Sequence, residues 1–253
     1  MSDRTPPPNW FESGGKAYAA FRPDYPDALV AYLGEIAPDQ DLAVDVGCGT
    51  GQLTALLAQH FRKVVGIDPS AEQLANASQH PLVEYAQAHA ESLPLPDGCA
   101  SLVVAAQAAH WFDLPRFYRE VRRIARKPAA LALVGYGAPR FEEGSLQSRF
   151  ARFYEHEIGP FWPPERRLVD QGYATIDFPF PEFAPPLLSI QRRWDLNQVL
   201  GYFSTWSAVK RAVLAGKVEI IQSFQDDLRS LWQREDEAKS ICWPIMIRAG
   251  AIE

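Results

Sequence analysis

The chain has 253 residues, of which 47% are hydrophobic and 22% are charged, a composition typical of a folded globular protein. Its 25 Lys and Arg residues face 31 Asp and Glu residues, so the formal net charge is −6, and no basic run offers a footprint for nucleic acid or an anionic membrane. No apolar run is long enough for a transmembrane helix, and the charged, proline-rich start lacks the apolar core of a secretory signal. Three scattered cysteines without metal-ligand spacing favour free thiols in a cytoplasmic protein that binds no metal.

The first 24 residues are expected to form an N-terminal tail and a lid segment ahead of the main domain. Three consecutive prolines make the first ten residues a loose tail, and an apolar helical stretch follows until Arg22 and Pro23 end it. A second helix is expected over residues 26–36, because proline suits a first helical turn and apolar residues then repeat at helical spacing.

Residues 25–140 carry the pattern of an α/β core. Short apolar runs without polar alternation predict buried strands, and helical stretches lie among them. This rhythm predicts a doubly wound, mostly parallel sheet that is covered by helices on both faces. The expected strands are residues 42–46, 64–68, 82–88, 99–107 and 129–137, and the expected helices are residues 54–61, 70–80 and 114–127.

Residues 141–253 lose this rhythm and are rich in aromatic residues and proline. They are expected to form an inserted, mainly helical cap over the carboxyl ends of the strands, with helices at 196–216 and 218–235. Two closing strands, at about 185–194 and 240–249, would return to the sheet and bring it to seven strands. Pro244 interrupts the second of these, which favours an edge position or a bulge. We interpret most of the cap aromatics as its own core, with an aromatic binding pocket as the alternative.

The most informative motif follows the first strand, where Asp45 leads into Gly47, Cys48 and Gly49. Glycines at this place allow positive φ angles and let a ligand approach backbone N–H groups at the start of a helix. The spacing departs from the G-x-G-x-x-G dinucleotide fingerprint, and no P-loop lysine follows. A carboxylate at the mouth of this loop would repel a pyrophosphate and favour a ligand that carries an ammonium and a sulfonium.

A second carboxylate, Asp68, ends the next strand. An acid at this place can accept hydrogen bonds from both hydroxyls of a ribose. Together Asp45 and Asp68 indicate a nucleoside with free 2′ and 3′ hydroxyls and no phosphates. The alternative for each carboxylate is a purely structural role at the end of a strand or the start of a helix.

Four segments then occur in a family-specific order: VDVGCGTGQLT, VVGIDPS, AQAHAESLPLPDGCASLVVAAQAAHWFD and FYREVRRIARKPAALALVGY. Over about residues 15–137 the chain resembles the class I S-adenosylmethionine (SAM) methyltransferases. It is most similar to the methyltransferase type 11 family, which includes relatives of trans-aconitate methyltransferase. The resemblance implies a Rossmann-like methyltransferase fold, SAM as the cofactor and methyl transfer by in-line displacement. We expect the acceptor to be a small molecule, because the acidic chain shows no basic patch.

The resemblance also implies roles for the matching residues. The backbone at Gly47 and Gly49 would hold the methionine part of SAM, and Asp68 would bind the ribose hydroxyls. We expect Tyr18 and Arg22 to belong to a lid over SAM, with Arg22 pairing its carboxylate, and a solvated helix end is the alternative. The other expected cofactor contacts are Cys48 in the loop, Pro69 beside the adenine, Ala90 and Glu91 at the adenine edge, and Gln107 facing the methionyl amino group.

The candidate catalytic residue is His110, which follows the fourth strand at the rim where an acceptor would lie. It would act as a general base if the acceptor carries a proton that must leave, and a structural histidine is the alternative. Two further function classes stay open. A SAM-binding protein without transferase activity would share the cofactor site, whereas an NAD-type oxidoreductase is disfavoured by the glycine spacing and by Asp45.

Overall fold

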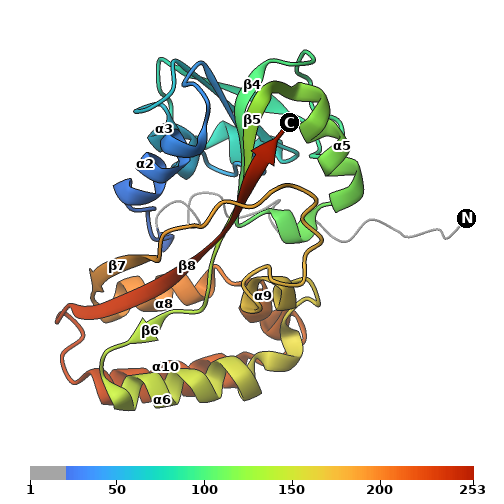
Figure 1. Ribbon diagram of the computed structural model, residues 1–253. Coiled ribbons are helices and arrows are strands. Elements are labelled where there is room, and N and C mark those ends of the chain that lie inside the picture. The colour runs from blue at the N-terminus through green and yellow to red at the C-terminus, as the bar shows by residue number, and fades with distance from the viewer. Residues whose placement is uncertain (1–20) are drawn as a thin grey trace, which may run out of the picture.

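The central feature of the fold is one mixed sheet of eight strands with helices on both faces (Figure 1). The computed structural model describes residues 21–253. The strands are β1 (Leu42–Val46), β2 (Lys63–Asp68), β3 (Val83–Gln87), β4 (Ala100–Ala106), β5 (Ala125–Tyr136), β6 (Arg140–Phe141), β7 (Leu188–Trp194) and β8 (Lys239–Ile252). Their order along the sheet is β3-β2-β1-β4-β5-β8-β6, and β7 pairs with β8 outside this path.

The strands β1 to β5 run parallel, and the order of connection reverses between β1 and β4. Both of these strands are buried along nearly their whole length, because helices cover this part of the sheet from both sides. Ligands of open α/β sheets bind outside the carboxyl ends of the strands at such a reversal. The loops that follow β1, β2 and β4 therefore form the edge at which a ligand is expected.

Two hydrophobic clusters fill the two sides of the sheet. The helices α2 (Asp27–Ile36) and α3 (Gln52–Leu57) contribute to one cluster, and α5 (Leu114–Ile124) contributes to the other. The short helix α4 (Ala71–Ala75) begins at Ser70, whose hydroxyl accepts a hydrogen bond from the Gln73 N–H. A single turn of 3₁₀ helix, η1 (Ala109–Trp111), precedes α5.

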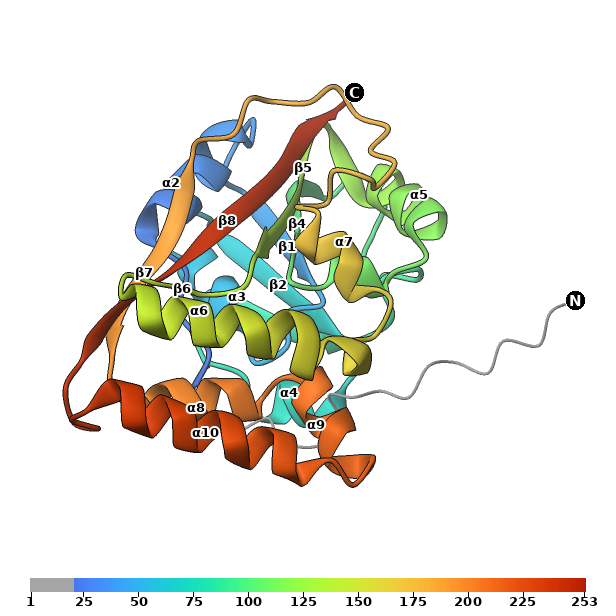
Figure 2. The same ribbon diagram turned by 90° about the horizontal axis from the view of Figure 1, so that it is seen from below.

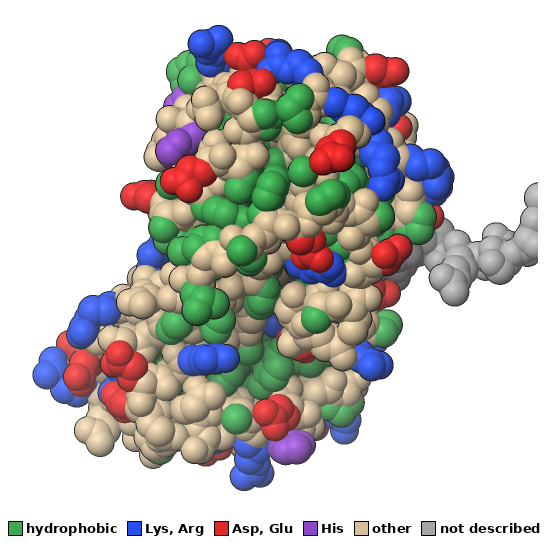
Figure 3. Space-filling model, in the orientation of Figure 1, with side chains coloured by type: hydrophobic (Ala, Val, Ile, Leu, Met, Phe, Trp, Pro, Cys, Tyr) green, Lys and Arg blue, Asp and Glu red, His purple; other side chains and the backbone are tan. Residues whose placement is uncertain are grey.

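Positively charged side chains gather over α5 on one face of the molecule (Figure 3). Arg123 forms ion pairs with Glu120 at 2.7 Å and with Asp97 at 2.8 Å. Arg122 donates to the carbonyl of Pro179 at 3.2 Å. Arg122 and Arg123 thus bind groups of the protein itself. The expected lack of a nucleic-acid partner stays a prediction.

The long strand β8 joins the core to the cap (Figure 1). Its second half pairs antiparallel with β5, and its first half pairs with β6 and β7. Pro244 lies where the neighbour on one side changes from β6 to β5. Gly137 donates its N–H to the Pro244 carbonyl at 3.1 Å. In an extended strand the nitrogen and the carbonyl of one residue point to the same side, so the Pro244 nitrogen also faces this gap. Because proline has no N–H, it needs no acceptor there. The expected edge position of this strand is therefore corrected, because a local gap inside the sheet tolerates the proline.

The cap is mainly helical, and three of its helices lie side by side (Figure 2). Arg149 links two of them, because it lies on one helix and its Nε donates to Asp227 on another at 2.7 Å, while its Nη2 donates to Glu157 at 3.0 Å. The three helices are α6 (Gly144–Arg152), α8 (Leu196–Ser204) and α10 (Val218–Trp232). The shorter cap elements are η2 (Phe153–Glu157), η3 (Gly159–Phe161), α7 (Arg166–Asp170) and α9 (Ser207–Leu214).

The predicted fold class is confirmed, since the sheet is mostly parallel, doubly wound and joined to an inserted helical cap. The sheet has eight strands instead of seven because the two-residue strand β6 is added. The helix expected over 196–216 is two helices, since Trp206 adopts an extended conformation with φ −72° and ψ 136°. The proposed boundaries after residues 24 and 140 stay predictions. No helix among residues 21–253 combines the length and the apolar character that a membrane span requires.

Candidate functional site

The glycine loop after β1 is pinned to the end of β2 by backbone hydrogen bonds. Gly47 and Cys48 both donate their N–H groups to the carbonyl of Ile67, at 2.7 and 3.1 Å. Gly47 has a φ of +73°, and a Cβ atom at this position would lie 2.4 Å from the Cβ of Ala108, in the loop after β4. Only glycine combines this φ with this close approach, so the loop brings the ends of β1, β2 and β4 together.

The next glycine leaves open space in front of the loop. Gly49 has a φ of +55°, and the nearest atom to an added Cβ would be Oε1 of Gln73, 3.9 Å away. Its N–H donates to Oδ2 of Asp68 at 2.9 Å, so the carboxylate at the end of β2 sits directly beside the open loop. The two predicted groups, loop and carboxylate, are thus in contact.

Tyr85 on β3 is a residue that the sequence analysis missed, and it shapes the far side of the loop. Its ring and hydroxyl occupy the places where side chains at Gly66 and Gly51 would project, because added Cβ atoms would lie 2.7 and 2.1 Å from Tyr85. The Tyr85 hydroxyl donates to the carbonyl of Ser78 at 2.7 Å. Nothing in a local pattern signals this role, since it arises from packing between β2, β3 and the loop.

Asp45 lies inside the molecule beneath the loop and is only 1% exposed. Thr54 on α3 donates its hydroxyl to Oδ2 of Asp45 at 2.6 Å, whereas Oδ1 is buried and has no hydrogen-bond partner within residues 21–253. The pKa of Asp45 is raised to about 7, mainly by burial. The hydrogen bond from Thr54 lowers this pKa, and the negative charge of Asp68 raises it further. Oδ1 therefore calls for a hydrogen-bond donor that residues 21–253 do not provide.

Asp68 can still accept hydrogen bonds from a ligand, although it already accepts bonds from backbone N–H groups of the protein. Its Oδ1 accepts from the N–H of Ser70 at 2.8 Å, and its Oδ2 accepts from Gly49. Burial raises the pKa of Asp68, and these two backbone hydrogen bonds lower it. Each carboxylate oxygen can accept a second hydrogen bond, so two hydroxyl groups of a ribose remain possible donors.

The other expected cofactor contacts lie along the same edge, with different local environments. Pro69 is exposed and follows Asp68, and Ala90 is buried after β3. Glu91 already accepts a hydrogen bond from the backbone N–H of Asp113 at 2.9 Å. Burial raises the pKa of the Cys48 thiol, and the charges of Asp45 and Asp68 act in the same direction, so Cys48 is a lining group and not a reactive thiolate.

Two residues with positive φ angles lie near the rim formed by the ends of β4 and β5. Gln107 has a φ of +55° and donates its amide to the carbonyl of Tyr136 at 2.9 Å. Tyr173 has a φ of +59° and is buried, and its hydroxyl lies 3.2 Å from Nδ1 of His110. Strained non-glycine conformations cluster at functional sites, where surrounding structure holds them in place. Tyr173 is a second rim residue that the sequence analysis missed.

His110 itself is held as a neutral imidazole. Burial, together with the positive charge of Arg166, lowers its pKa to about 3. At physiological pH the ring can accept or donate one hydrogen bond, and it is a weak proton acceptor.

The segment before α2 touches both halves of the molecule. Nη1 of Arg22 donates to the hydroxyl of Tyr136 at 3.2 Å, and the guanidinium lies 5.4 Å from the ring centroid of Tyr202 on α8. Phe21 packs against α8, because an added Cβ at Gly201 would lie 2.3 Å from its ring. Arg22 thus links the end of β5 to the cap, as a lid residue would, whereas Tyr18 lies outside the described residues.

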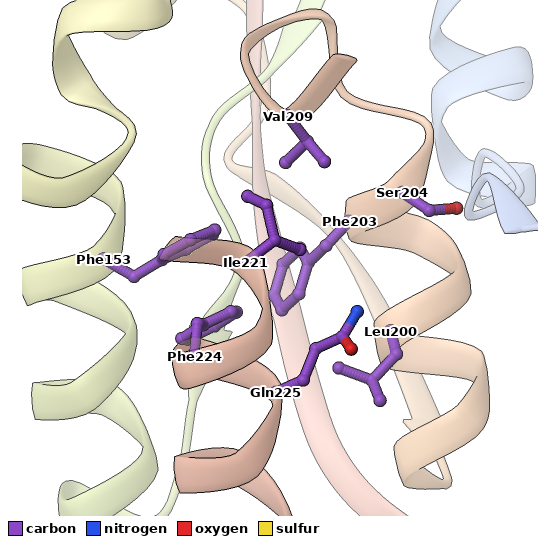
Figure 4. A pocket seen from close by; sticks show the side chains of 8 residues that line it. All are labelled: Phe153, Leu200, Phe203, Ser204, Val209, Ile221, Phe224 and Gln225. Carbon is purple, nitrogen blue, oxygen red and sulfur yellow. The ribbon is translucent and has the colours of Figure 1, made fainter. Parts of the chain in front are cut away.

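A small cavity lies elsewhere, among the cap helices (Figure 4). Its volume of about 40 Å³ is room for a few water molecules and far too small for a nucleoside. Its walls are mostly apolar and belong to the cap core: Phe153, Leu200, Phe203, Ser204, Val209, Ile221, Phe224 and Gln225. This cavity is a packing defect and has no part in the candidate site.

Comparison with known proteins agrees with this geometry. A family model described as a methyltransferase domain matches residues 44–133. A Dictyostelium discoideum protein that is named as a methyltransferase is 34% identical over 243 residues, which cover 93% of this chain and 92% of that protein. The chain belongs to the class I SAM-dependent methyltransferases. This membership favours methyl transfer over the oxidoreductase alternative.

Two further relatives support the methyltransferase assignment. A solved structure from Anaeromyxobacter dehalogenans, described as a type II methyltransferase, is 43% identical with a TM-score of 0.84 and covers 92% of this chain and 99% of that chain. A Saccharomyces cerevisiae protein named as an S-adenosylmethionine-dependent methyltransferase is 31% identical over 133 residues, which are 49% of this chain and 46% of that protein. The specific relationship to trans-aconitate methyltransferase stays a prediction.

The methyltransferase thus brings most of its predicted site residues to one edge of the sheet. Asp45, the glycine loop and Asp68 lie together after β1 and β2, while Gln107 and His110 lie after β4. Among residues 21–253, no cluster of His, Cys, Asp and Glu has the arrangement of a metal site.

Proposed function

We propose that this methyltransferase binds SAM across the carboxyl ends of β1, β2 and β3 and transfers its methyl group to a small-molecule acceptor. The observation that carries the proposal is the contact between the Gly49 N–H and the Asp68 carboxylate beside open backbone. A phosphate-free nucleoside fits this contact, because the carboxylate has lone pairs for hydroxyl donors and repels phosphate.

Each part of the site has a place in the proposal. The backbone of Gly47, Cys48 and Gly49 would line the methionine part, and the free Oδ1 of Asp45 would complement its positive charge. Asp68 would accept the ribose hydroxyls. The adenine would lie among Pro69, Ala90 and Glu91, and the methionyl end would lie beside Gln107, with Arg22 near its carboxylate.

The chain's own contribution to the reaction is alignment and exclusion of water. SAM, when bound, supplies a methyl group on a positively charged sulfur. Holding the reacting atoms in line gives about 7–11 kcal/mol toward the barrier, so an obligatory base is not required. We propose that His110, neutral and oriented by Tyr173, forms a hydrogen bond with the acceptor at the rim.

The surroundings of the site favour a small acceptor. The cap covers the same edge of the sheet, and Arg22 bridges the cap to β5. We keep the cytoplasm as the expected location, because all three cysteines are free thiols.

Calorimetry with SAM, S-adenosylhomocysteine (SAH) and NAD tests the cofactor part. SAM and SAH are expected to bind and NAD is not. Asp68→Asn should weaken SAM binding at least tenfold, since hydrogen bonds to a charged group contribute about 1.5–3 kcal/mol each. Asp41→Asn is the matched control, because Asp41 lies before β1 at the other end of the sheet and pairs with Arg62. Equal SAM affinity in both variants would contradict the placement.

Labelled SAM and a library of small acceptors test the transfer part. Methylated product supports the proposal. Tight SAM binding without turnover across the library would favour the alternative, a SAM-binding protein that does not transfer.

A further inference from the structure

A buried cationic side chain, Arg166, lies between the cap and the rim of the core. It opens α7, which packs against η1, the turn that carries His110. Its side chain is only 17% exposed. Nothing in the sequence marks this arginine, since it stands in an irregular, proline-rich segment.

Within residues 21–253, the guanidinium of Arg166 donates hydrogen bonds from only one of its nitrogens. Nε donates to the hydroxyl of Tyr154 at 3.1 Å and to Oδ1 of Asp170 at 3.0 Å. The two terminal nitrogens, Nη1 and Nη2, donate no hydrogen bond to any residue from 21 to 253. A guanidinium fork whose terminal nitrogens are both free matches the two oxygens of a carboxylate.

A second unsatisfied donor lies beside this fork. The Trp162 ring is 4.8 Å from the Arg166 guanidinium, and its Nε1–H is buried without a hydrogen-bond partner in the described part of the chain. Buried donors are nearly always satisfied in folded proteins, so this group calls for an acceptor that the chain itself does not provide. Trp162 also packs on Trp206 and Tyr154, with ring centroids 5.3 Å apart in both pairs, so tilted aromatic rings surround the place.

The positive charge of Arg166 reaches the rim of the core. At His110 burial is the larger cause of the low pKa, and the charge of Arg166 lowers that pKa as well. At Tyr173 burial raises the pKa, and the charge of Arg166 opposes this increase. Asp170 pairs with the Nε side and is 38% exposed, so it offsets the charge on the side away from the free nitrogens. An ammonium-bearing acceptor would be repelled at this place, and an anion would be attracted.

We infer that Arg166 and Trp162 form the part of the acceptor site that binds an anionic oxygen group, so that the acceptor is an apolar molecule carrying a carboxylate. This inference rests on the proposed function, which puts the acceptor at the rim beside His110. Arg166 and Trp162 are then specificity-determining residues of the transferase.

Two probe pairs of matched shape test the inference on the full-length, SAH-loaded protein: 2-naphthoate with 2-naphthamide, and benzoate with benzamide. Calorimetry is expected to show each carboxylate binding at least tenfold more tightly than its amide. Arg166→Gln should bring the ratio close to one, and Arg166→Lys should restore part of it, because lysine keeps the charge without the fork. Arg167→Gln is the control, since this exposed neighbour lies on the same helix.

The outcomes distinguish failure of the proposed function from failure of the carboxylate site. SAH affinity and thermal stability are measured first in all variants, and failure of the wild-type protein to bind SAH contradicts the proposed function. If SAH binds, the inference is overturned by equal affinity for acid and amide, by a preference that survives Arg166→Gln, or by the lack of carboxylate binding in both pairs.

Discussion

Replacing Asp45 with asparagine is expected to stabilise the protein in a pH-dependent way when no cofactor is present. Burial of this carboxylate raises its pKa from 3.8 to about 7 in the folded chain. The difference of about 3 pH units corresponds to about 4 kcal/mol, at 1.36 kcal/mol per unit. Between the two pKa values the unfolded chain has lost this proton and the folded chain keeps it, so the wild-type protein loses stability as the pH rises toward 7. Above pH 7 the loss is complete and levels off.

Urea unfolding of the wild-type protein and Asp45→Asn between pH 5 and pH 9 measures this effect. Asparagine cannot ionise, and its side-chain oxygen can still accept the hydroxyl of Thr54. The stability of the variant relative to wild type should increase by about 3 kcal/mol from pH 5 to pH 8 and then stay constant. The effect of His110 is common to both proteins and cancels in the difference.

Asp226→Asn, on the surface of α10, controls for the general effect of removing a carboxylate. A stability difference for Asp45→Asn that is flat or falls with pH would refute the assignment of a buried, protonated carboxylate. The same ionisation bears on the cofactor: wild-type affinity for SAM should rise as the pH rises from 6 to 8, and Asp45→Asn should lose this dependence.

Further variants test other contacts. In urea unfolding, Gly51→Ala should lower the unfolding free energy by about 2–5 kcal/mol, because the residue has a left-handed φ and an added methyl group would clash with Tyr85. Gly98→Ala is the control: its φ is similar but it has no neighbour within 4 Å, so the loss should be only about 1–2 kcal/mol. Gly201→Ala should displace Phe21 from α8 and raise the KM for the acceptor with little change in stability, and an unchanged KM would count against a lid role for this segment. The pH profile of kcat should show no inflection from His110 between pH 5 and pH 8, because its pKa is about 3; an inflection that disappears in His110→Gln would contradict this.

The parts of the fold that the sequence predicts well are those that depend on neighbours along the chain. The buried runs at β1 and β4 match their expected positions within one residue, because continuous apolar character and glycine-rich ends are local signals. The loop with Gly47 and Gly49 was recognisable for the same reason. In contrast, α6 is not predicted, since it is short and polar in sequence and is stabilised by burying Leu146 and Phe150 against distant segments.

The parts of the site that the sequence does not predict depend on contacts between residues that are far apart along the chain. Tyr85 acts on glycines of the neighbouring strand and loop, and Tyr173 reaches His110 from beyond the end of α7. Arg166 becomes informative only through tertiary structure, in which its two terminal nitrogens have no hydrogen-bond acceptor among residues 21–253. None of these relations leaves a spacing pattern in the chain, so coordinates are needed to find them.

The position of β8 has a consequence for how such an enzyme can change its choice of acceptor. The chain leaves the sheet after β5 and β6, builds the cap around β7, and re-enters beside β5 through β8. Both attachment points of the cap therefore lie on adjacent strands, away from the half of the sheet formed by β1 to β3. Substitutions or insertions in the cap can remodel acceptor recognition while the nucleoside half of the protein keeps its geometry, which makes this architecture a modular starting point for redesign of the alkylated product.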